Sequence, residues 1–133
     1  MIYALDTNII SYVLRDDENV KERWRTEELR GNKTVLPLIV YYETMRGLVS
    51  VNAGTKMRAF EKICEKLEIG NLTIEDMNTA AQIYSNLKNQ GCTVDDADLL
   101  IAAQCISNGY TLVTNNTKHF ENIDGLSLEN WAV

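Results

Sequence analysis

The stretch Ile2-Tyr3-Ala4-Leu5-Asp6 opens the chain with mostly apolar residues that end at a carboxylate. A short apolar run of this kind is typical of a strand buried on both faces of a parallel sheet. We expect a strand over 2–5, followed by a helix through 9–14 that Thr7 or Asn8 caps. Asp6 then lies at the carboxyl end of a strand, where open α/β sheets bind their ligands.

Short apolar runs and helical segments alternate along the rest of the chain. Further strands are expected at 34–36, 67–69, 110–113 and 126–128, helices at 17–30, 38–51, 55–67, 73–89 and 95–106, and a polar loop at 114–117. This alternation predicts a three-layer α/β/α fold with a central, mainly parallel sheet of about five short strands. The length of 133 residues predicts a single domain over 1–133.

The composition restricts the classes of function. A net charge of −6 argues against tight, non-specific binding to a polyanion, which depends on many Lys and Arg contacts. It is compatible with a cluster of carboxylates that bound cations neutralise.

The three cysteines form no C-x-x-C pair, so we expect free thiols, with Cys64 and Cys105 buried. The start of the chain does not resemble a signal peptide, and no run reaches the roughly 18 apolar residues of a membrane span, which predicts a cytoplasmic protein.

Several acidic side chains are expected at the carboxyl edge of the sheet. Asp6 ends the first strand, Glu43 lies early in the helix after the second, and Asp98 opens the helix before the strand at 110–113. Two charges about 4 Å apart repel by roughly 1–4 kcal/mol, and a bound divalent cation offsets that repulsion. We therefore expect Asp6 and Asp98 to ligate Mg²⁺ directly, and Glu43 to bind it through water or to act as a general base.

Each candidate also has a purely structural explanation. Asp98 follows Asp95 by three residues and is explained equally well as part of a helix cap. Glu43 is explained by an ion pair with Arg46 on an exposed helix face. Asn116 is a typical turn residue. The only histidine, His119, is expected to be structural or exposed rather than catalytic.

Four motifs follow one another along the chain. They are Asp6-Thr7-Asn8 after the first strand, Tyr-Tyr-Glu-Thr-Met-Arg-Gly around Glu43, Ala-Asp-Leu-Leu-Ile-Ala-Ala around Asp98, and Leu-Val-Thr-Asn-Asn-Thr-Lys-His-Phe at 112–120. Taken together they resemble the PIN-domain ribonucleases, and among them the VapC toxins of bacterial toxin–antitoxin pairs. The resemblance covers nearly the whole chain, including the ending Leu-Ser-Leu-Glu-Asn-Trp. Each motif alone is weak, but all four in this order are specific.

The resemblance implies a type II toxin that cleaves RNA, often tRNA, by attack of a metal-activated water on a phosphodiester, with Mg²⁺ or Mn²⁺ as cofactor. Asp6, Glu43 and Asp98 match the family's most regular acidic positions, and Asn8 and Thr114 match supporting polar positions. Asn116 stands where a fourth acid is common, which argues for one firm metal ion, although Asp95 and Asp96 offer further charge. Homodimerisation and a small antitoxin partner are also implied. Arg46 and Lys118 are candidate RNA phosphate contacts, and both are equally explained as solvated surface cations.

Two other functions have to be weighed. A phospho-receiver domain needs an acidic pair after the first strand and an acceptor Asp after the third. Here one acid follows the strand at 2–5, and no Asp directly follows the strand at 67–69. A catalytically weak PIN-like module that binds RNA or protein stays open, because Asn116 adds no charge.

Overall fold

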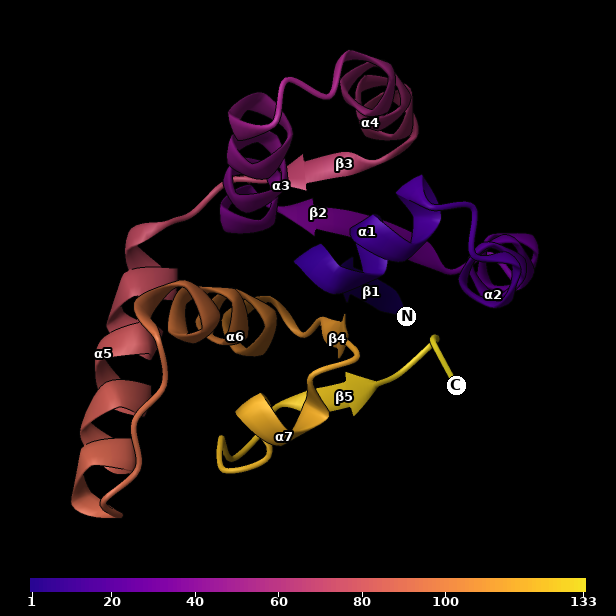
Figure 1. Cartoon of the computed structure of the whole chain (residues 1–133). Helices are drawn as coiled ribbons and strands as arrows, with labels where there is room; N and C mark the ends of the chain where they lie inside the picture. The colour runs from indigo at the N-terminus through magenta and orange to yellow at the C-terminus, as the bar shows by residue number, and fades with distance from the viewer.

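The computed structural model describes residues 1–133 and shows five parallel strands in one central sheet (Figure 1). The strands are β1 (Ile2–Leu5), β2 (Lys33–Pro37), β3 (Glu68–Gly70), β4 (Thr111–Val113) and β5 (Ser127–Glu129). They lie in the order β3-β2-β1-β4-β5, and every neighbouring pair is parallel. The three-layer fold expected from the sequence is confirmed. Because β1 is central, the residue that follows it lies in the middle of the sheet's carboxyl edge.

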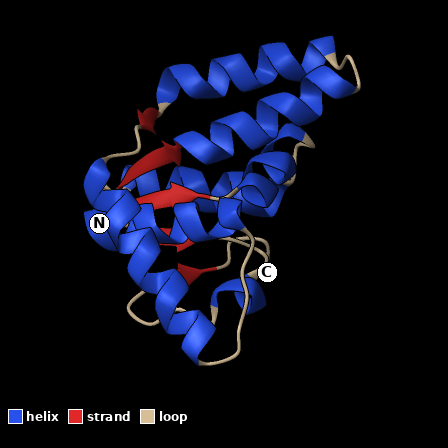
Figure 2. Cartoon of the chain, turned by 90° about the vertical axis from the view of Figure 1, so that its left-hand side faces the viewer, coloured by secondary structure: helices blue, strands red, loops and turns tan.

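Helices flank the sheet (Figure 2). They are α1 (Thr7–Leu14), α2 (Glu18–Leu29), α3 (Leu38–Ser50), α4 (Gly54–Lys66), α5 (Ile74–Asn89), α6 (Asp96–Asn108) and α7 (Thr117–Phe120). The apolar residues that they bury form one cluster with the strands, and the C-terminal segment covers it where Trp131 packs edge-on against Tyr3, with ring centroids 5.2 Å apart. None of the helices is both long enough and apolar enough to cross a bilayer.

Two local predictions need correction. The expected loop at 114–117 is confirmed over 114–116, but Thr117 begins the short helix α7, which the sequence did not predict and which buries the Phe120 ring against the core. A single turn is too short to show helical periodicity in a sequence. The helix α1 is capped by Asp6 and not by Thr7 or Asn8, because the Asp6 carboxylate accepts a hydrogen bond from the Thr7 amide at 2.8 Å. Asp6 thus ends a strand and begins a helix.

The three cysteines are free, as expected. Cys105 is buried, but Cys64 is only half-buried, which corrects the expectation that both thiols lie in the core. Burial raises the pKa of both thiols, so neither is poised as a thiolate nucleophile.

Buried polar side chains hold α6 in place beside the sheet. The Gln104 amide donates to the backbone carbonyls of Gly70 at 2.8 Å and Asn71 at 3.3 Å, just after β3. A Cβ atom at Gly70 would lie 2.8 Å from that same nitrogen, so a larger residue there would displace the Gln104 amide. Since α6 carries Asp98 near its beginning, these contacts also restrict where Asp98 lies.

Candidate active site

Asp6 is buried at the middle of the sheet's carboxyl edge, with 4% of its surface exposed. One carboxylate oxygen accepts from the Thr7 amide at 2.8 Å. The other accepts from the Asn8 side-chain amide at 3.1 Å and from the Thr114 hydroxyl at 2.8 Å. Three donors therefore orient this carboxylate. An ionised carboxylate has about four acceptor positions, so room for a further partner remains.

Glu43 points toward the same edge from α3. Its Oε1 accepts from the Thr7 hydroxyl at 2.9 Å, which ties it to the residue beside Asp6. Its Oε2 lies 3.8 Å from the Arg46 guanidinium and accepts no hydrogen bond. The side chain is only 20% exposed, so the explanation of Glu43 as a member of an exposed ion pair is wrong, although the pair with Arg46 exists.

Asp98 approaches the site from the first turn of α6. Its carboxylate accepts no hydrogen bond from the chain, and its one close partner is the His119 imidazole on α7, at 3.6 Å. Asp95 precedes α6 without capping it through its side chain, and no capping box forms there. The structural explanation of Asp98 as a capping residue is therefore not supported by the geometry.

The two aspartates interact electrostatically. Burial raises the pKa of Asp6, against hydrogen bonds from Thr114, Thr7 and Asn8 that lower it. Burial also raises the pKa of Asp98, and the negative charges of Asp6 and Glu43 raise it further. The Asp6 and Glu43 carboxylates thus lie close enough to Asp98 for their charges to disfavour its ionisation. Such a cluster is short of positive charge.

This shortage predicts a pH dependence of stability without metal. The folded state binds protons at Asp6 and Asp98 more tightly than the unfolded chain does, so stability falls as pH rises above their ordinary value of 3.8. The pKa of the buried Glu27 is lowered, so the stability that this carboxylate contributes to the fold is lost only at still lower pH. We expect a higher melting temperature at about pH 5 than at about pH 7 in EDTA. Thermal denaturation followed by circular dichroism measures this difference in melting temperature. A melting temperature that rises from pH 5 to pH 7 contradicts the raised pKa values of Asp6 and Asp98.

The residues expected to support the site fall into two groups: Asn8 and Thr114 form hydrogen bonds with Asp6, whereas Asn116, Arg46 and Lys118 do not. Asn8 and Thr114 bind each other as well as Asp6, and the Asn8 side-chain oxygen accepts from the Asn115 backbone amide at 2.8 Å. Asn116 is exposed, and its backbone amide donates to the Thr114 hydroxyl at 3.0 Å. Arg46 lies beside Glu43, with its guanidinium 5.2 Å from the centre of the Tyr42 ring. Lys118 lies exposed on α7.

Two participants were missed by the sequence reasoning. Thr7 was considered only as a helix cap, but its hydroxyl positions Glu43. His119 was assigned a structural or surface role, yet it is the cation nearest to Asp98 when protonated. The Asp-Thr-Asn motif offered a signal for Thr7. Nothing local offered one for His119, because its partner lies on another helix.

The donor chemistry of the site fits a hard divalent cation. No group of three or more His, Cys, Asp or Glu side chains stands in ready-made metal geometry. Mg²⁺, however, takes only one or two carboxylates and completes its shell with water and substrate oxygens. Asp98 has both oxygens free of hydrogen bonds, and Asp6 has a free acceptor position. These two residues are the candidates for direct ligands, with Glu43 beyond them.

Comparisons with known proteins agree with this fold. The family model of the PIN domain matches residues 3–126. Ribonuclease VapC1 of Haemophilus influenzae (strain R2866) is 30% identical over 133 residues, covering 99% of each chain. The tRNA(fMet)-specific endonuclease VapC of Shigella flexneri is 26% identical over 132 residues, covering 98% of each chain. A crystal structure of VapBC2 from Rickettsia felis, bound to a DNA fragment from its promoter, superposes with a TM-score of 0.92 at 28% identity, covering 98% of this chain and 99% of that one.

The match over nearly the whole chain and the fold point to the same group of proteins. The family model spans β1 to the segment just before β5, and so includes Asp6, Glu43 and Asp98. The chain belongs to the PIN-domain family and, within it, to the VapC ribonucleases.

Proposed function

We propose that this protein is a metal-dependent endoribonuclease that acts as the toxin of a type II toxin–antitoxin pair. The observation that carries the proposal is the cluster of Asp6, Glu43 and Asp98, in which burial raises the pKa of both aspartates and the charges of Asp6 and Glu43 raise the pKa of Asp98 further. Family membership supports the same activity. A stable fold tolerates such a charge cluster most readily where a cation binds it.

Each residue has a role in this proposal. Asp6 and Asp98 hold Mg²⁺ or Mn²⁺, and Asn8 and Thr114 keep the Asp6 carboxylate oriented. When bound, such an ion lowers the pKa of a water molecule and stabilises negative charge on phosphodiester oxygens. Glu43 is held through Oε1 by Thr7, which leaves Oε2 free to accept a proton from the attacking water.

Positive side chains at the edge of the site are proposed to position the substrate. Arg46 is 59% exposed and lies one turn after Glu43, where its guanidinium can bind an RNA phosphate. Lys118 on α7 is a second candidate. The substrate that we propose is tRNA, and the tRNA(fMet)-specific relative of Shigella flexneri supports that choice.

Incubation of the wild-type protein with total tRNA tests this function. We expect discrete cleavage products with Mg²⁺ or Mn²⁺ and none with EDTA, resolved on a denaturing gel. If no RNA is cut with either metal, the protein is instead a PIN-like binding module. If cutting persists in EDTA, the metal dependence is wrong.

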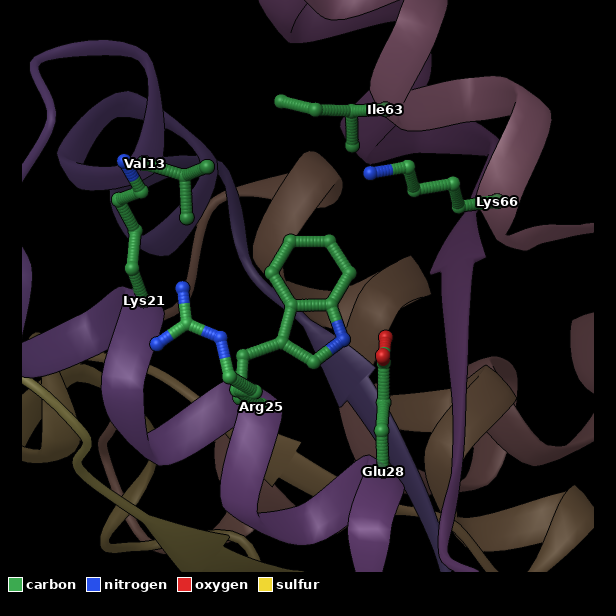
Figure 3. A pocket seen from close by; sticks show the side chains of 7 residues that line it. Val13, Lys21, Arg25, Glu28, Ile63 and Lys66 are labelled. Atoms are coloured by element: carbon green, nitrogen blue, oxygen red, sulfur yellow. The ribbon is translucent and has the colours of Figure 1, made fainter.

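An antitoxin is the proposed protein partner, since the solved neighbours include toxin–antitoxin complexes. A groove of about 190 Å³ between α1, α2 and α4 offers it a docking site (Figure 3). Val13, Trp24 and Ile63 supply its apolar lining, and the buried Trp24 indole nitrogen has no hydrogen-bond partner. We expect the Ile63→Glu variant to keep its RNA cleavage activity. We also expect that an antitoxin gene encoded beside it no longer restores the growth of cells that express the variant. Normal rescue of that variant excludes this groove.

A homodimer is the proposed assembly. An apolar stripe on α3 repeats at helical spacing and consists of the exposed Leu38, Tyr42 and Val49 with the half-buried Met45 between them, and Tyr42 is 58% exposed. A second copy that presents the same stripe would cover it symmetrically. Sedimentation equilibrium is expected to give a dimer for the wild type and a monomer for Tyr42→Lys. A monomeric wild type at micromolar concentration contradicts the proposal.

A further inference from the structure

A strip of hydrogen-bonded polar side chains leads away from the carboxylate site along α1. Asn8 and Tyr12 lie one turn apart on this helix, and both bind Asn115 in the loop after β4. The Asn115 backbone amide donates to Asn8 at 2.8 Å, and its side-chain amide donates to the Tyr12 hydroxyl at 3.0 Å. Asn115 in turn accepts from the Asn130 amide, after β5, at 3.2 Å. Asn8 also binds Asp6, so the strip begins at the proposed metal site.

Two hydrogen-bond donors at the far end of the strip, the Arg15 guanidinium and the Tyr12 hydroxyl, have no acceptor within the chain. The Arg15 guanidinium lies 4.9 Å from the centre of the Tyr12 ring, is exposed, and forms no ion pair, although the chain has a net charge of −6. The Tyr12 hydroxyl accepts from Asn115 and donates to no group of the chain. A cation and a free hydroxyl donor therefore lie side by side on the surface.

We propose that Tyr12, Arg15, Asn115 and Asn130 form a subsite that binds the RNA strand on one side of the bond that is cut. The inference rests on the nuclease function proposed above. At about 1.5 Å of rise per residue, the Arg15 backbone lies about 13 Å further along the axis of α1 than Asp6, which suits a phosphate further along the strand and not the scissile one.

The chemistry of the strip selects the class of RNA. Amide and hydroxyl groups reach base edges and ribose hydroxyls most readily in single-stranded segments, such as loops. An arginine stacked on a tyrosine is the type of surface that supports unpaired bases. Paired RNA offers mainly its backbone to such a surface, so it is expected to bind more weakly.

Fluorescence anisotropy with a short, unstructured, labelled RNA in EDTA measures this binding without cleavage. Arg15→Ala is expected to raise Kd about five- to tenfold and to reduce the slope of log K against log salt by about 0.7, as for one lost phosphate contact on a single strand. Tyr12→Phe keeps the ring under Arg15, so it is expected to raise Kd about two- to threefold without changing the salt slope.

Arg58→Ala is the matched control. Arg58 is also exposed and forms no ion pair, but it lies on α4 and binds only Thr55 of its own helix. We expect its removal to leave Kd and the salt slope nearly unchanged. A circular dichroism melt of each variant checks that the fold is intact.

The outcomes separate this inference from the proposed nuclease function. Equal Kd values for Arg15→Ala and Arg58→Ala, or a duplex of the same sequence that binds as tightly as the single strand, overturn the strip. If the wild type binds unpaired RNA as expected but cuts none with metal, the nuclease function fails and the strip stands.

Discussion

Asp6→Asn and Asp98→Asn are each expected to lower the rate of RNA cleavage at least about 100-fold, since even the outer partners of metal ligands contribute about 10- to 100-fold. Both changes keep the size of the side chain and remove its charge. Asp98 accepts no hydrogen bond from the chain, so Asp98→Asn loses no internal hydrogen bond and weakens only the contact with His119. Initial rates on tRNA with saturating Mg²⁺ measure the effect.

Asp96→Asn is the matched control for Asp98→Asn. Asp96 lies in the same first turn of α6, but it is exposed and makes no contact with the cluster. Its cleavage rate is expected to stay within about twofold of wild type, because an exposed charge at a helix start contributes only a few tenths of a kcal/mol. Equal losses in the two variants would show that the helix needs negative charge there rather than a metal ligand.

Asp76→Ala is expected to have the largest effect on stability. Asp76 is 1% exposed, accepts from the Thr73 amide at 3.0 Å in a capping box, and binds Ser107 and the Asn108 amide on α6. Alanine removes the half of the capping box that the Asp76 carboxylate supplies, while the Thr73 hydroxyl still caps the helix, and it leaves the Thr73, Ser107 and Asn108 donors without this partner at about 1 kcal/mol or more each. A loss of about 2–4 kcal/mol follows, and urea denaturation at neutral pH measures it.

Glu75→Ala provides the comparison for this variant. Glu75 is the preceding residue in the first turn of α5, but its side chain is exposed and binds nothing. Its loss is expected to cost less than about 0.5 kcal/mol. If both variants unfold at the same urea concentration, the buried contacts of Asp76 with α6 contribute nothing.

The sequence was sufficient for the sheet and for the central carboxylates. Uninterrupted apolar runs such as 2–5 read as buried parallel strands because both of their faces are covered by helices. Asp6 could be placed because the end of a strand determines which edge of the sheet a following residue occupies. The capping box that begins α5 was equally readable, since Thr73 and Asp76 satisfy each other locally.

The rest depends on contacts between elements far apart in the sequence. His119 meets Asp98 only because α7 packs against α6, and no spacing within one helix encodes that approach. The direction in which the Glu43 side chain points could not be predicted, because α3 is apolar on most of its faces. In the structure, a hydrogen bond from the Thr7 hydroxyl on α1 fixes it. The roles of Asn116 and Lys118 in the reaction stay predictions, since both are exposed.

The central claim is that Asp6, Glu43 and Asp98 form a site for one divalent cation. Calorimetric titration of the purified protein with Mn²⁺ tests it most directly, with Asp6→Asn titrated beside the wild type. The account predicts that the wild type binds about one ion per chain, as two direct carboxylate ligands suggest, and that the variant binds none at the same concentration. A wild type that takes up no Mn²⁺, or a variant that binds it with unchanged affinity, contradicts the account.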